Sequence, residues 1–219
     1  MHFDDAVTNT GFDDAVAGAQ RAAVACQVFT DISNLIHEAQ SPYSSITNLG
    51  SGNSYVEIQV QTSLNSSTNP TLGMAGQYFL TTSPGIVHGS VWQTINSGMD
   101  TWFAINASNL GTVGIYHGLL QINFGHNFYT GTATSGIGAT QSDLYSVILH
   151  EAIHALGFGS LIDQNGKSKL TNTNPGIYSF YDTYLTDVSG NKLINTTNCY
   201  TSTFNTIDLP KLTTLALLN

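Results

Sequence analysis

One segment of this chain, QSDLYSVILHEAIHALGFGS from Gln141 to Ser160, constrains the fold more than any other. Its apolar residues recur at helical spacing and make one stripe: Leu144, Val147, Ile148 and Leu156. Thr140 and Asp143 have the spacing of a capping box, and Gly157 is a typical helix stop. The sequence therefore predicts a helix over residues 141–156 with one face against a core.

Two histidines and a glutamate on this helix carry the strongest chemical signal. His150 and His154 are four residues apart, so their imidazoles lie on one helix face about 6 Å apart. Two neutral imidazoles at that separation can share one zinc ion. Glu151 lies beside them, where a carboxylate can take a proton from zinc-bound water. The spacing therefore predicts a Zn²⁺ site with His150 and His154 as ligands and Glu151 as catalytic base.

The charge balance excludes one class of partner. Among 219 residues, five are Lys or Arg and fourteen are Asp or Glu, which gives a net charge of −9. A phosphate backbone is bound by clustered basic residues, and the sequence has no such cluster. No run of about 18 apolar residues is present, so no membrane span is expected. We therefore expect neither nucleic-acid binding nor a transmembrane helix.

The composition favours a secreted protein, whereas the two cysteines do not decide the compartment. Few lysines and abundant Ser, Thr and Asn favour a secreted bacterial protein, although residues 1–10 lack the pattern of a signal peptide. Cys26 and Cys199 lie 173 positions apart and have no metal-binding spacing. They would form a disulfide in an oxidising compartment or stay as buried thiols, and the sequence leaves both alternatives open.

The remaining chain predicts an α+β protein. The Ala-rich stretch Asp13–Ile36 predicts a helix. Its apolar stripe comprises Val24, Val28, Phe29, Ile32, Leu35 and Ile36. Alternation and turn signals predict strands at Tyr55–Gln61, Gly85–Thr94 and Thr112–Phe124. Since no long repeat or linker interrupts the chain, we expect a single domain over residues 1–219.

A short motif, FDDAV, occurs twice near the amino terminus, at Phe3–Val7 and Phe12–Val16. We interpret it as a local duplication whose second copy opens the first helix. Asp13 and Asp14 would then lie at the positive end of the helix dipole. The two copies lack the ligand spacing of an EF-hand, which argues against calcium.

The zinc-helix segment resembles a known family. HEAIHALGFGS is similar to the H-E-x-x-H-x-x-G-x-x-H pattern of the metzincin metallopeptidases, and more closely to the HExxHxLGF of leishmanolysin-like secreted bacterial peptidases. The likeness covers Phe128–Leu193, including the downstream segment YSFYDTYLTDVSGNKL. It implies a zincin-like α+β domain with a twisted, mixed or mostly antiparallel sheet, an N-terminal helix and a central zinc-binding helix. It also implies a zinc metalloendopeptidase that acts on protein or peptide substrates.

The third zinc ligand departs from the family pattern. Ser160 stands where metzincins usually place a third histidine, and neither His nor Met follows His154. Three interpretations stay open: a domain truncated before a ligand beyond Asn219, a carboxylate ligand, or a degenerate site. We favour Asp182 over Asp163 as the carboxylate, because the resemblance includes YDTYL. Asp182 could equally serve as a buried hydrogen-bonding anchor of its loop.

Two functions follow as hypotheses. In the first, Glu151 is the general base of a secreted zinc endopeptidase, and the substrate adds as an extended strand to a sheet edge. Leu119–Phe124 is the predicted edge strand. In the alternative, the chain is a secreted β-rich binding or adhesion module with a degenerate, inactive zincin site, because uncharged surfaces rich in Tyr and Asn suit glycan contacts.

Overall fold

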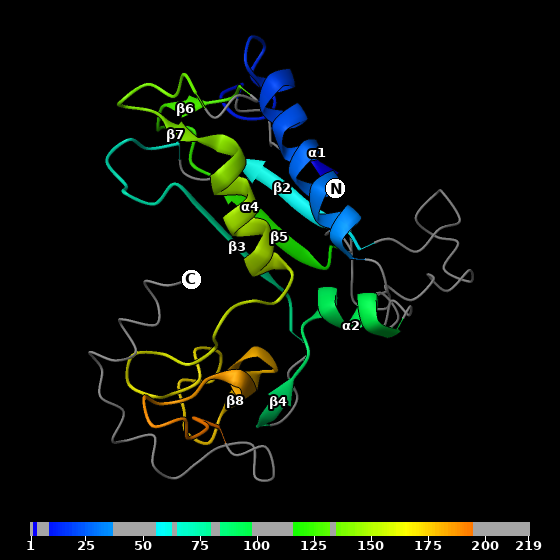
Figure 1. The fold of residues 1–219 in the computed structure, drawn as a ribbon, viewed down its shortest axis with the longest axis vertical. Coiled ribbons are helices and arrows are strands. Elements are labelled where there is room, and N and C mark those ends of the chain that lie inside the picture. The colour runs from blue at the N-terminus through cyan, green and yellow to red at the C-terminus, as the bar shows by residue number, and fades with distance from the viewer. Residues whose placement is uncertain are drawn as a thin grey trace. The chain divides into compact units, whose positions relative to one another are not determined.

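The computed structural model describes residues 2–3, 9–36, 56–62, 65–79, 84–97, 116–131 and 135–194 (Figure 1). Two compact units are present, each described by itself. Unit 1 comprises Met1–Tyr78 with Ser90–Leu156, and unit 2 comprises Phe79–Gly89 with Gly157–Asn219. The expectation of a single domain stays a prediction. The mixture of helices and small mixed sheets confirms the α+β class.

Unit 1 is built on a four-stranded mixed sheet in the order β1-β2-β5-β3. The strands are β1 (His2–Phe3), β2 (Ile58–Thr62), β5 (Gly118–Ile122) and β3 (Gly73–Gln77). β1 and β5 both run parallel to β2, and only β3 is antiparallel to its neighbour β5. The sheet is therefore mixed as expected, but parallel pairings predominate instead of antiparallel ones. A further parallel pair joins β6 (Phe128–Tyr129) to β7 (Ser142–Asp143).

Helices complete the core of unit 1, mainly α1 (Gly18–Leu35) and α4 (Leu144–Ala155), with Val91 of α2 (Ser90–Ser97) also fully buried in it. In Figure 1, α4 lies beside α1, and α4 also packs against β3 and β5. Burial alternates along β2 and β5, so one face of each strand points into the core. The side chains that fill this core include Val28 and Ile32 of α1, Val60 of β2, Leu120 and Ile122 of β5, and Leu144 and Ile148 of α4.

The first helix begins later than the sequence predicts. Residues before Gly18 form turns, because the Asp14 carboxylate accepts hydrogen bonds from the backbone N–H groups of Val16 and Ala17, at 2.8 Å each. This Asx-type turn competes with helical hydrogen bonding, which explains the late start. Leu35 was expected in the buried stripe but is 78% exposed at the last turn of α1.

Two strand predictions were wrong in extent or position. The strand expected at Gly85–Thr94 is β4 (Gly85–Val87), after which the chain turns into the helix α2 (Ser90–Ser97). Leu119–Phe124 was expected at an edge, but β5 lies between β2 and β3. Alternation reveals that one face of a strand is buried, not how many strands flank it. Among the described strands of this sheet, β1 and β3 lie at the two edges.

The described residues of unit 2 contain little regular structure. β4 pairs in parallel with β8 (Ile177–Ser179), and a 3₁₀ turn, η2 (Tyr181–Tyr184), follows. Its small core is formed by Ile162, Tyr178, Leu193 and Ile194. In the described part of the chain, no helix has the length and apolar character that crossing a membrane requires. Tyr55, residues 112–115 and Cys199 lie outside the described residues; Cys26 is exposed on α1.

Candidate metal centre

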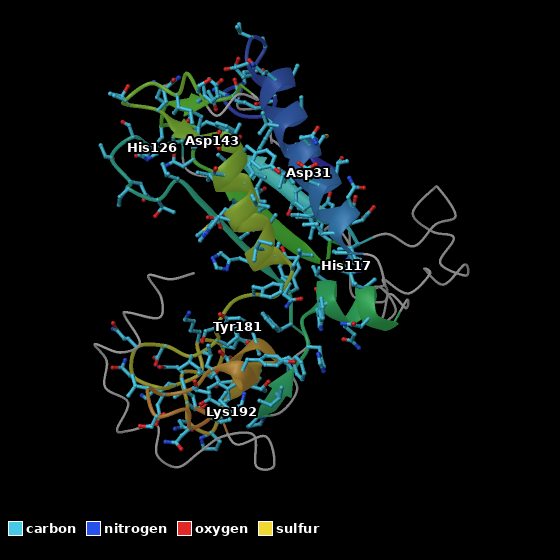
Figure 2. The ribbon with its side chains drawn as sticks, in the orientation of Figure 1. Asp31, His117, His126, Asp143, Tyr181 and Lys192 are labelled. Atoms are coloured by element: carbon cyan, nitrogen blue, oxygen red, sulfur yellow. The ribbon has the colours of Figure 1, made fainter. Side chains whose placement is uncertain are left out.

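The helix α4 forms as the sequence predicts, with one correction at its start. Asp143, not Thr140, is the capping residue, and its Oδ2 accepts from the backbone N–H of Ser146 at 3.0 Å (Figure 2). At the other end the N–H of Leu156 donates to the carbonyl of Ala152 at 2.9 Å, and Gly157 has a φ of 106°. A glycine in this left-handed region ends the helix as expected.

The two histidines of α4 converge. Their Nε2 atoms lie 3.1 Å apart, with the ring centroids 4.7 Å apart and the rings nearly perpendicular at 89°. Two nitrogen ligands of a tetrahedral zinc, each about 2.0–2.1 Å from the metal, lie about 3.3–3.4 Å from one another. Hence the His150 and His154 nitrogens are already near the separation that zinc imposes. His150 is exposed and His154 is partly exposed, so both can be reached from solvent.

Glu151 lies beside the two histidines on α4, toward the buried side of the helix. Only 8% of the residue is exposed, whereas its neighbour His150 is open to solvent. Burial raises the pKa of the Glu151 carboxyl above its ordinary value, and the nearby His154 and His150 oppose that shift. A carboxylate whose pKa is raised toward neutrality is better matched to general-base work.

The edge strand β3 supplies a neighbour that the sequence analysis missed. Gly73, its first residue, is close enough to Glu151 that a Cβ at position 73 would lie 2.9 Å from Glu151 Cγ. The available signal was a glycine at the start of a short β-prone run, LGMAGQ, which by itself points to a close backbone approach.

Asp182, the predicted third ligand, belongs to unit 2 and is fully buried there. Its Oδ2 accepts from the backbone N–H of Ser179 at 2.8 Å, from the Ser179 hydroxyl at 2.9 Å and from the N–H of Leu161 at 3.1 Å. Burial raises the pKa of Asp182, while the hydrogen bonds from Ser160, Ser179 and Leu161 lower it. These contacts are those of a loop anchor, the alternative role that the sequence left open.

Asp163, the other candidate carboxylate, caps a turn at the surface of unit 2. Its Oδ1 accepts from the backbone N–H groups of Asn165 and Lys167, at 2.8 Å each. Asp187 makes the same contacts with Ser189 and Asn191, at 2.8 and 2.9 Å. The two aspartates therefore share one turn geometry, which argues for a structural role at both positions.

The other described histidines have structural surroundings. His117 is fully buried, and its Nδ1 accepts from the backbone N–H of Glu57 at 3.1 Å. His126 Nε2 lies 2.6 Å from the carbonyl oxygen of Asn69. His88 stacks on Phe180 with centroids 4.7 Å apart. Within the described ranges, no group of three or more His, Cys, Asp or Glu side chains is arranged to hold a metal ion.

Comparisons with known proteins add no family assignment. No family model matches the chain, and no curated protein or solved structure matches it either.

Proposed function

We propose that this chain is a secreted, zincin-type, zinc-dependent endopeptidase. The observation that carries the proposal is the convergence of His150 Nε2 and His154 Nε2 to 3.1 Å, next to the buried carboxylate of Glu151. Solvent-facing imidazoles held at this separation fit two positions of a zinc ion. A catalytic zinc takes three protein ligands, and the hydrogen bonds of Asp182 favour anchoring over the ligand role that we predicted for it.

Glu151 has the chemistry of the general base. A zinc ion held by His150 and His154 would supply a water of lowered pKa and polarise the scissile carbonyl. The Glu151 carboxylate would accept a proton at one oxygen and return it to the leaving amine nitrogen. Its burial supports this role, because burial raises the pKa of the Glu151 carboxyl and so makes the carboxylate a stronger base.

The substrate would bind as an extended strand along β3. This strand ends the sheet order, so its outer backbone groups face away from β5. An added strand would pair with these groups, which gives affinity through the main chain and little side-chain selectivity. Because β3 packs on α4 and begins beside Glu151, a peptide on this edge would lie near the proposed metal centre.

Zinc content and Glu151→Gln together test the proposal. After dialysis we expect about one zinc per chain, and casein hydrolysis that a chelator blocks. His150→Ala and His154→Ala should lose zinc, whereas Glu151→Gln should keep zinc and lose hydrolysis. Activity that persists in Glu151→Gln, or that ignores the chelator, would refute the mechanism.

The alternative function is a binding module with a degenerate site. It is favoured by the exposed aromatic side chains of unit 2, Tyr184 at 63% and Phe158 at 51%, which could stack on sugar rings. Glycan-array binding that is unchanged by chelator, in a protein without zinc and without hydrolysis, would support this alternative.

A further inference from the structure

We propose that Gly73 is a positioning residue for Glu151, and that the missing side chain at this one point of β3 sets where the general base lies. The inference rests on the proposed function, because it assigns a role to a second residue of the same site. It starts from a steric fact: a Cβ built on Gly73 would lie 2.9 Å from Glu151 Cγ, closer than such carbon atoms approach in proteins.

The backbone around Gly73 is fixed from three directions. Gly73 pairs with Ile122 in the β3–β5 ladder, and a Cβ would also lie 3.1 Å from the Gln121 carbonyl oxygen and 3.2 Å from Ile122 Cδ1. On the other side, α4 packs against β3. A side chain at position 73 therefore has no direction in which to move without displacing a neighbour.

The segment before Gly73 is held as well. Asn123, only 2% exposed, accepts at Oδ1 from the Ser66 N–H at 2.8 Å and donates from Nδ2 to the carbonyl oxygens of Ser66 and Thr71, at 2.8 and 3.0 Å. The backbone N–H of Asn123 also donates to the carbonyl of Leu72 at 2.8 Å. Because strand and preceding loop are both held, the Glu151 side chain is the group that must yield to a larger residue at 73.

The strand offers a matched control. Gly76 lies on the same strand, three residues on, and a Cβ built there meets nothing within 4 Å. Neither glycine has a positive φ that would strain a substituted residue. Gly73→Ala and Gly76→Ala thus make the same chemical change in the same strand, and only Gly73→Ala places a methyl group against Glu151.

The first test measures stability, so it is independent of catalysis. Gly73→Ala should lower the melting temperature by at least about 2–4 °C, whereas Gly76→Ala should leave it unchanged or raise it. In a Glu151→Ala background, which lacks Cγ, most of the Gly73→Ala loss should disappear; in a Glu151→Gln background, which keeps Cγ, it should persist. An equal loss in all three backgrounds would overturn the assignment.

The second test measures turnover. Gly73→Ala should keep its zinc and lose about tenfold or more in kcat with KM changed less than about threefold, since small displacements of a catalytic group are costly. Gly76→Ala should match wild type, and a Gly73→Ala enzyme with the kcat of Gly76→Ala would refute the positioning role. If the wild-type protein shows no zinc-dependent hydrolysis, the proposed function fails, and the stability cycle still decides whether Gly73 positions Glu151.

Discussion

Different interactions stabilise the interior of each of the two units of this chain. Unit 1 has an apolar core that joins its helices to a sheet, and residues such as Val60, Leu120 and Ile148 are fully buried. Within its described residues, unit 2 has a core cluster of four buried side chains, and other side chains hydrogen-bond to its backbone. Asp182 holds the Ser179 and Leu161 segments, and the Ser168 hydroxyl donates to the carbonyl of Ile177 at 2.6 Å.

This difference in stabilisation explains why ionisable side chains have different roles in the two units. In unit 1 the apolar core holds α4 in place, so its histidines are left at the surface and available to a ligand. In unit 2 the buried carboxylate of Asp182 is part of what holds the fold, since buried polar groups must be hydrogen-bonded. The same comparison distinguishes the exposed imidazole pair, a candidate metal site, from Asp182, whose buried carboxylate anchors its loop by hydrogen bonds. The ligand role of Asp182 stays a prediction.

The largest expected loss of stability comes from removing a buried side chain from the core of unit 1. Ile148→Ala should lower the free energy of unfolding by about 2–5 kcal/mol, because the fully buried side chain leaves a cavity under α4. Urea unfolding followed by circular dichroism measures the loss. Ile153→Ala is the matched control, on the same helix but 36% exposed, and it should cost clearly less. Equal losses at the two positions would contradict the packing described for α4.

A somewhat smaller loss of stability is expected when a buried hydrogen-bond acceptor of unit 2 is removed. Asp182→Ala leaves the buried N–H groups of Ser179 and Leu161 without their acceptor, and should cost about 3 kcal/mol in urea unfolding. Asp187→Ala, at an exposed turn, should cost about 1 kcal/mol or less. Zinc content separates the roles of Asp182: retention in folded Asp182→Asn supports the anchor, and its loss would restore the ligand prediction.

The Asp182 carboxylate should also make the free energy of unfolding depend on pH. Burial raises the pKa of Asp182 above its ordinary value of 3.8, so the folded state binds this proton more tightly than the unfolded state. Stability from this group is therefore gained as pH falls from neutral through the raised pKa, and is complete below 3.8. The difference in unfolding free energy between wild type and Asp182→Asn should shift in favour of wild type over that range. A constant difference would contradict the raised pKa.

The sequence predicted the features that depend on nearby residues, and it did not predict those that depend on contacts between distant segments. Local signals located α4, the convergence of His150 with His154, and a half-buried alternating strand at β2, because helical and strand periodicity depend only on nearby residues. The sequence could not give the position of β5 in the sheet or the contact of Gly73 with Glu151, since both depend on pairing between distant segments. Asp182 shows the third case: a buried anchor and a metal ligand call for the same residue type, and only its surroundings distinguish them.

The smallest expected loss of stability comes from removing one hydrogen bond between α1 and α4 in unit 1. Because the apolar core dominates the stability of this unit, the loss tests the contrast with unit 2. Tyr145 on α4 donates its hydroxyl to Asp31 Oδ2 on α1 at 2.7 Å, and this hydrogen bond raises the pKa of Tyr145. Tyr145→Phe should cost only about 1 kcal/mol, since the ring keeps its packing. Asp31→Ala in both backgrounds removes the acceptor and completes a double-mutant cycle by urea unfolding. A coupling above about 2 kcal/mol would show that polar contacts hold α1 to α4 as strongly as they stabilise unit 2.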